Sequence, residues 1–144
     1  MNVFIDTNVL LDVMLERRGF YRDSLAVWSL AEQGKIAGQI SVISFNNIYY
    51  IVRKIRSRKT ADRVLVMLRD VFTPISLDGK ILNQAIAAGF ADFEDAIQYY
   101  SALHADASCI ISRNPDHFPK SPRDRGYDLP VLSPAEFLAA YSLT

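Results

Sequence analysis

Short apolar runs alternate along the chain with longer segments that have the spacing of helices. The first run, residues 2–5, is rich in β-branched and aromatic side chains and predicts a buried strand. Residues 9–16 predict a helix, and residues 22–33 repeat apolar side chains at about 3.6-residue intervals. Further strands are predicted over 36–43, 71–76, 108–111 and from 131, and further helices over 46–55, 60–70 with Thr60 as cap, 78–88, 92–105 and from 133.

This alternation predicts an α/β fold, a three-layer α/β/α sandwich with a mainly parallel central sheet. Ligands of such sheets bind beyond the carboxyl ends of the strands. Two polar segments directly follow predicted strands, Asp6 after residues 2–5 and Ser112 to Asp116 after residues 108–111. The strand ends are therefore the first places to search for chemistry.

Composition narrows the class of protein. The 144 residues suit one domain spanning 1–144, and 16 basic residues balance 16 acidic ones. Half of the residues are hydrophobic, which excludes a disordered chain, and the zero net charge excludes a nucleic-acid binder that relies on bulk positive charge. A single cysteine, Cys109, excludes a disulfide scaffold and a multi-cysteine zinc site. Without a membrane-length apolar run or a basic leader, we expect a soluble cytoplasmic protein with no membrane partner.

Acidic residues gather at the predicted helix starts. Asp6 precedes the first helix, and Asp92, Glu94 and Asp95 open another. The simplest interpretation is helix capping, because Asp and Asn side chains accept hydrogen bonds from free backbone amides there. Three acids in one first turn exceed what capping requires, so we also consider a carboxylate cluster that holds a metal ion.

Taken together, three segments and the chain's last helix resemble the PIN-domain family, whose bacterial members include VapC-like toxin ribonucleases. The matching segments are FIDTNVLLD, DFEDAIQYYSA, IISRNPDHF and LSPAEFLAAY. The resemblance implies a PIN-like sandwich and an endoribonuclease that depends on Mg²⁺ or Mn²⁺. It also implies a homodimer and, for a toxin, a small antitoxin protein as partner.

The resemblance names candidate site residues. Asp6 and Asp95 are the expected metal ligands, and Asn114 and Asp116 the further catalytic candidates. Asn47 stands where the family usually has a Glu, and an amide carries no charge to hold a cation. We therefore expect one well-held ion and at most a weak second. The possible accessory residues are Asn8, Asn47, Asp92 and Glu94.

Positive charge for RNA is concentrated in two stretches. One runs from Arg53 to Lys59, and the other contains Lys120, Arg123 and Arg125. The predicted RNA contacts are Arg53, Lys54 and Arg113. Two alternatives stay open. The first is that the chain is a degenerate PIN domain that binds RNA or protein without cutting. The second is that it is a nuclease that acts on DNA.

Overall fold

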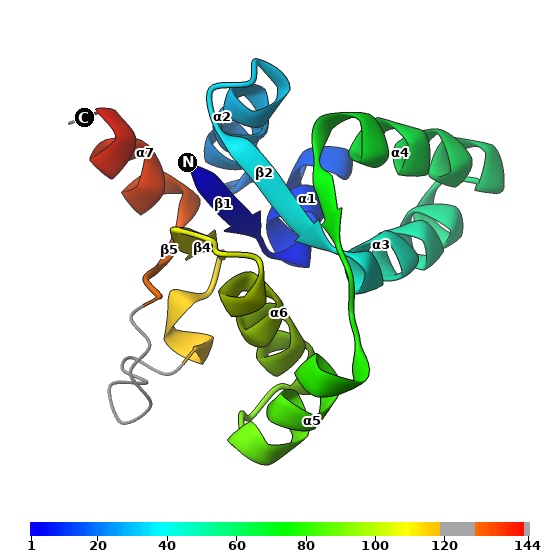
Figure 1. The fold of residues 1–144 in the computed structure, drawn as a ribbon. Coiled ribbons are helices and arrows are strands. Elements are labelled where there is room, and N and C mark those ends of the chain that lie inside the picture. The colour runs from blue at the N-terminus through cyan, green and yellow to red at the C-terminus, as the bar shows by residue number, and fades with distance from the viewer. Residues whose placement is uncertain (119–128, 143–144) are drawn as a thin grey trace.

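The computed structural model describes residues 1–118 and 129–142, so the predicted basic stretch from Lys120 to Arg125 lies outside it. Figure 1 shows a central sheet with helices on both faces. The strands are β1 (Asn2–Ile5), β2 (Ala37–Ser41), β3 (Thr73–Ile75), β4 (Cys109–Ile111) and β5 (Val131–Leu132). The helices are α1 (Thr7–Met14), α2 (Tyr21–Glu32), α3 (Val42–Ile55), α4 (Arg58–Val71), α5 (Gly79–Ala88), α6 (Phe93–His104), η1 (Pro115–His117) and α7 (Pro134–Ser142). In these ranges no helix is both long and apolar enough to cross a bilayer.

The five described strands form one sheet in the order β3-β2-β1-β4-β5, and each neighbouring pair is parallel. This confirms the predicted three-layer sandwich. The chain adds β2 and β3 on one side of β1, then returns to add β4 and β5 on the other. The order therefore reverses beside β1, and the carboxyl ends of β1 and β4 border the position where parallel sheets bind ligands.

Alternate side chains of the sheet enter two separate cores. Val3 and Ile5 pack on one face with side chains from α1 to α4 and from α7. Phe4 packs on the opposite face with side chains from α5 and α6. Residues 3–5 are at most 1% exposed, which explains their unbroken apolar run. Burial on both faces fixes the position and direction of β1 in the sheet. It therefore also fixes the position of Asp6, the residue that follows β1.

The structure corrects several predicted boundaries. The strand predicted over 36–43 ends at Ser41, and the helix predicted from Asn46 begins at Val42. Ser41 ends the strand because its side chain accepts the N–H of Ile43 and caps the new helix, a cap concealed by its β-branched neighbours. The cap assigned to Thr60 is likewise wrong, because Ser57 accepts the Thr60 N–H at 3.1 Å.

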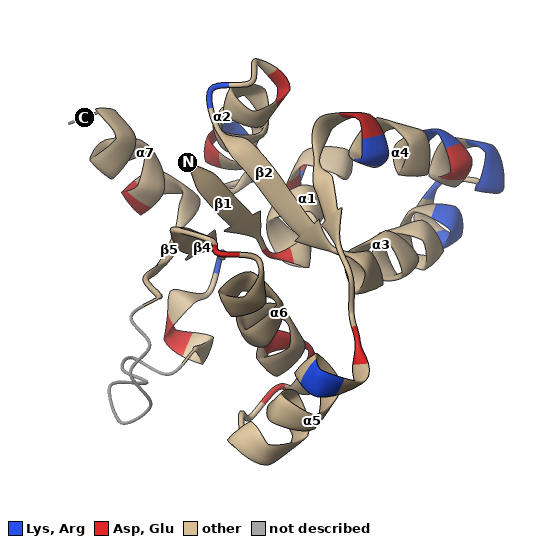
Figure 2. Ribbon diagram, in the orientation of Figure 1, with Lys and Arg blue, Asp and Glu red and all other residues tan. Residues whose placement is uncertain are grey.

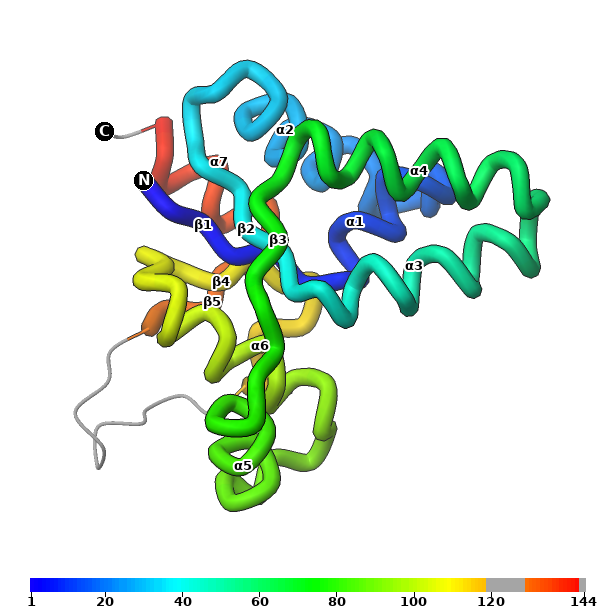
Figure 3. The backbone as a smooth tube through the Cα atoms, turned by 45° about the vertical axis from the view of Figure 1, so that its right-hand side comes forward, coloured from blue at the N-terminus to red at the C-terminus, as the bar shows by residue number. Residues whose placement is uncertain are grey.

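Helices α3 and α4 form a hairpin that projects away from the sheet, to the right in Figure 3, while α6 and then α5 lie below the sheet in that view. Gly38 in β2 permits the close packing at the base of this hairpin. A Cβ at Gly38 would lie 2.6 Å from the Phe72 ring, which itself packs edge-on against Trp28. The core behind β2 therefore requires a glycine at position 38.

Candidate active site: an acidic pocket beside β1 and β4

Asp6 occupies the N-cap position of α1, but its side chain does not cap the helix. Its carboxylate accepts the Gln98 amide on Oδ1 and the Ser112 hydroxyl on Oδ2, each at 2.8 Å. Its backbone N–H donates to the Ile111 carbonyl and so extends the β1–β4 pairing by one residue. Asp6 is 4% exposed. Both carboxylate oxygens are therefore held mainly by residues far away in the sequence, so capping alone does not account for Asp6.

A second set of hydrogen bonds joins α1, α3 and α6 around Asp6. Thr7 donates to Glu94 Oε1 at 2.9 Å, and the hydroxyls of Thr7 and Ser44 lie 2.7 Å apart. Gln98 donates to both Asp6 and Glu94, with the longer bond to Glu94 at 3.4 Å. One amide nitrogen thus lies between two carboxylates from different parts of the fold.

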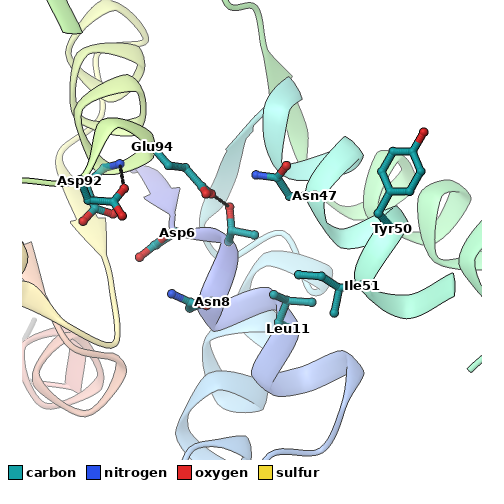
Figure 4. A pocket seen from close by; sticks show the side chains of 10 residues that line it. Asp6, Asn8, Leu11, Asn47, Tyr50, Ile51, Asp92 and Glu94 are labelled. Carbon is teal, nitrogen blue, oxygen red and sulfur yellow. Dashed lines mark hydrogen bonds between the residues drawn. The ribbon is translucent and has the colours of Figure 1, made fainter. Parts of the chain in front are cut away.

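The acids of α6 meet Asp6 across a pocket of about 380 Å³. Asp92 caps α6 as predicted, because its carboxylate accepts the Asp95 N–H at 3.0 Å. Figure 4 shows Asp6, Asp92 and Glu94 around the opening, with Asn8 and Asn47 on the α1 and α3 sides. The pocket is lined by Asp6, Thr7, Asn8, Leu11, Asn47, Tyr50, Ile51, Asp92, Glu94 and Asp95.

Burial raises the pKa of both Asp6 and Asp95, and neighbouring carboxylates raise that of Asp95 further. Burial and then the charges of Asp6, Asp92 and Glu94 raise the pKa of Asp95 to about 7. Burial also raises the pKa of Asp6, against the opposite effect of its hydrogen bonds from Ser112 and Gln98. Close carboxylates repel unless a proton or a cation neutralises them. The pocket is therefore suited to attract positive charge.

The stability of the metal-free protein is expected to fall as pH rises through 7. The pKa of Asp95 is about 7 in the folded chain and 3.8 when the side chain has no such interactions, as in the unfolded chain. Between these two pH values the folded state retains a proton that the unfolded state has released. Stability from that proton is complete below the lower value and is lost as pH passes the higher one. Melting temperatures from about pH 5 to about pH 8 should show a shallower decline for Asp95→Asn than for the wild type. Equal declines would contradict the shifted pKa.

The donor set fits a single divalent cation. Within residues 1–118 and 129–142, no three Asp, Glu, His or Cys side chains are arranged as a ready metal-binding group. The pocket instead combines the carboxylates of Asp6 and Asp95 with the amides of Asn8 and Asn47. Mg²⁺ usually binds one or two carboxylates and keeps several waters. Asp6 and Asp95 therefore suffice as the carboxylate ligands of one such hydrated ion.

Not every predicted site residue lines the pocket. Asn114 and Asp116 lie in the turn after β4, where Asn114 is partly buried and Asp116 is exposed. Neither is among the lining residues, nor are Arg53, Lys54 and Arg113. Their catalytic and RNA-binding roles stay predictions.

Sequence reasoning missed two direct partners of Asp6. Gln98 is a fully buried polar residue within an apolar helix face, and it lies one turn after Glu94. That position is the signal that would have found it. Ser112 follows β4 directly and was noted only as part of a polar turn.

Comparisons with known proteins place this geometry in a family. Residues 2–116 match the PIN domain. Ribonuclease VapC1 from Aquifex aeolicus (strain VF5) is 26% identical over 140 residues, which cover 94% of this chain and 92% of that protein. VapBC from Salmonella typhimurium bound to DNA has a TM-score of 0.69 at 13% identity, covering 93% of this chain and 98% of that one. A toxin–antitoxin complex from Klebsiella pneumoniae has a TM-score of 0.65 at 21% identity, with 92% and 97% covered. With its fold shared by these structures and its sequence matched over most of its length, this chain belongs to the PIN-domain family.

Proposed function

We propose that this chain is a metal-dependent endoribonuclease and the toxin of a toxin–antitoxin pair. The observation that carries the proposal is the meeting of Asp6, from the end of β1, with Asp95, from the start of α6, in one pocket. The sequence similarity to ribonuclease VapC1 supports RNA as substrate and hydrolysis as the reaction.

Asp6 and Asp95 would hold Mg²⁺ or Mn²⁺, with Asn8 and Asn47 contributing directly or through water. When bound, such a cation lowers the pKa of its water and stabilises negative charge on phosphorus. The protein's part is to hold the ligands in place. Hydrogen bonds from Ser112 and Gln98 orient both carboxylate oxygens of Asp6, while the buried strand β1 fixes the position of its backbone.

The pocket also has an exposed apolar lip toward α3. Tyr50 lines the pocket and is 59% exposed, and its ring packs edge-on against Tyr49. An exposed aromatic ring beside a phosphate-cleaving site is suited to stack on a base. Tyr50 therefore gives the proposed RNA a contact that does not depend on charge.

The direct test is cleavage of single-stranded RNA by the purified chain in Mg²⁺, with and without EDTA. Cleavage that stops on chelation and is absent from single-stranded DNA of the same sequence supports the proposal. Equal cleavage of DNA favours the DNA-acting alternative. Bound but intact RNA favours the non-cleaving PIN domain, for which the specific observation is that α3 offers the pocket Asn47 rather than a carboxylate.

Asn47→Glu is expected to lower the Mg²⁺ concentration needed for half-maximal cleavage by about tenfold, because cation affinity rises with the charge of the ligands. Asn47 lies across the pocket from Glu94 (Figure 4), so the new carboxylate would add to the existing acids. The measurement is the Mg²⁺ concentration for half-maximal cleavage. Asn47→Gln is the control that lengthens the side chain without charge. An unchanged requirement in Asn47→Glu would contradict the charge-deficient site.

Positive charge for the substrate lies at the free end of the α3–α4 hairpin (Figure 2). We call this group of exposed cations the hairpin cluster; its members are Arg53, Lys54, Arg56, Arg58, Lys59 and Arg63. The ion pair described among them is Arg58 with Asp62, at 4.0 Å on the surface. Surface pairs of this kind are weak, so the cluster is available to phosphates. It begins one helical turn beyond Tyr50, on the same helix.

Replacing Arg53 and Lys54 together with Gln is expected to raise KM for RNA and leave kcat nearly unchanged. Each phosphate contact on a single strand contributes about 0.7 to the slope of log affinity against log salt, so the slope should fall by about 1.4. The control replaces Arg22 and Lys35, two exposed cations of α2 and the turn after it. KM and salt slope equal to those of the control would remove the cluster from RNA binding.

The comparisons also support a protein partner for this chain. The structural neighbours include toxin–antitoxin complexes, which supports a small antitoxin protein as the partner of this chain. A homodimer is part of the same proposal. An antitoxin encoded beside this chain should form a stable complex with it and suppress RNA cleavage. Light scattering of the isolated chain, which distinguishes one copy from two, tests the homodimer.

A further inference from the structure

A partly buried ion pair joins α1 to the turn after β4, with the side chain of Arg113 22% exposed. Asp12, in α1, is 0% exposed, and its Oδ1 contacts Arg113 Nη1 at 3.0 Å and Arg17 Nη1 at 3.5 Å. The Arg113 guanidinium also lies 4.4 Å from the centre of the Phe20 ring. Within the described residues, the second oxygen of Asp12 has no hydrogen-bond partner.

Such a pair is a weak source of stability. Removing two charges from water offsets most of their attraction, and apolar residues of similar size stabilise folds as well or better. The pair does, however, connect two segments 101 residues apart, α1 and the turn after β4. These are the segments that carry Asp6 and Ser112. Its position therefore favours a role in fixing the positions of these two segments relative to each other.

The turn after β4 orients the Ser112 hydroxyl. The backbone of Ser112 is fixed, because its N–H donates to the Leu132 carbonyl at 2.9 Å. Its Oγ accepts the Asn114 N–H at 3.1 Å and donates to Asp6 Oδ2 at 2.8 Å. With Asn114 occupying an acceptor site of this oxygen, the hydroxyl hydrogen is directed to Asp6. Arg113 lies between the two residues, so its clamped side chain holds the peptide that makes this arrangement.

We propose that Arg113 is a positioning residue of the acidic pocket. Its guanidinium is held between the Asp12 carboxylate and the Phe20 ring. This contact maintains the hydrogen bond from the Asn114 N–H to Ser112 Oγ, and so the hydrogen bond that the Ser112 hydroxyl donates to Asp6. This role differs from the RNA contact predicted for Arg113, and its kinetic test rests on the proposed nuclease function. Lys cannot replace Arg fully, because it lacks the planar group that both pairs and stacks.

The kinetic test compares Arg113→Lys and Arg113→Gln with Arg17→Gln. Arg17 pairs with the same carboxylate but is not part of the turn, so it is the matched control. We expect kcat to fall about 10- to 100-fold in Arg113→Gln, as for other residues that orient metal ligands. Arg113→Lys keeps a positive charge beside Asp12 and so protects folding. Its kcat should lie between that of the wild type and that of Arg113→Gln. Arg17→Gln should keep kcat within about threefold of the wild type, and KM should change in none of them.

Calorimetric titration with Mn²⁺ provides a second readout, with weaker binding expected in Arg113→Gln and unchanged binding in Arg17→Gln. Two kinetic results would overturn the proposal. One is an unchanged kcat in Arg113→Gln with a lowered melting temperature, which indicates support of the fold alone. The other is a raised KM with a salt slope reduced by about 0.7, the sign of a phosphate contact.

A third readout needs neither metal nor substrate. Ser112→Ala should lower the melting temperature strongly in the wild type and in Arg17→Gln, because a buried carboxylate loses its donor. In Arg113→Gln the same substitution should have less than half that effect. Equal effects in all three backgrounds would overturn the proposal. A wild-type chain that cleaves no RNA would remove the proposed function and leave this comparison to decide the role of Arg113.

Discussion

Asp6→Asn is expected to lower RNA cleavage roughly 10²- to 10³-fold, the range seen when one group that stabilises transition-state charge is removed. Asp6 is the acid at the end of β1, and its two oxygens already have a fixed orientation. The substitution removes its charge while keeping its shape. We expect Mg²⁺ affinity to fall with activity, because an amide oxygen is a poor substitute for a carboxylate.

The fold should tolerate this change. Asn at position 6 can accept the Gln98 amide and donate to the Ser112 oxygen, since a hydroxyl can reverse its role. The substitution also removes a buried carboxyl group whose pKa is raised by desolvation. The melting temperature of the metal-free protein should therefore not decrease. Cleavage within about threefold of the wild type would show that Asp6 is not a ligand of the reacting centre.

Asp95→Asn is expected to lower cleavage about 10²-fold. Burial, and then the charges of three neighbouring carboxylates including Asp6, raise the pKa of Asp95 to about 7. Binding a cation in the pocket should draw the proton from Asp95, so cleavage should rise with pH through neutrality. Kinetics of both proteins across that range measure this dependence, which should be reduced in the residual activity of Asp95→Asn.

Asp92→Asn is the matched control for Asp95→Asn. It makes the same chemical change three residues earlier, in a side chain whose hydrogen bond caps α6. Asn caps helices about as well as Asp, so the helix start should be preserved. We expect cleavage by Asp92→Asn to remain within about tenfold of the wild type. Equal losses in both variants would mean that general negative charge, and not ligation by Asp95, supports the reaction.

The parts of the fold that the sequence predicted are those set by local pattern. Residues 3–5 and 109–111 are buried on both faces of the sheet, and burial leaves an unbroken apolar run. Asp6 follows the first of these runs directly, so its place at the strand end was predictable. The cap at Ser41 was not, because the β-branched residues after it favour a strand.

The partners of Asp6 were not predictable for a different reason. Gln98 and Ser112 are 92 and 106 residues away, and their contacts depend on the register of β1 with β4 and on the rotation of α6. The same holds for the pair of Asp12 with Arg113. A sequence pattern identifies which side chains are polar within apolar segments, but only the folded chain determines which of them meet.

Crystals of the protein soaked in Mn²⁺ and measured at the manganese absorption edge test the metal site most directly. Anomalous density between the carboxylates of Asp6 and Asp95 is the expected result, and it should be absent from Asp6→Asn crystals treated in the same way. Wild-type crystals from an RNA-cleaving preparation that show no manganese at this position would contradict the assignment of these two acids as the ligands.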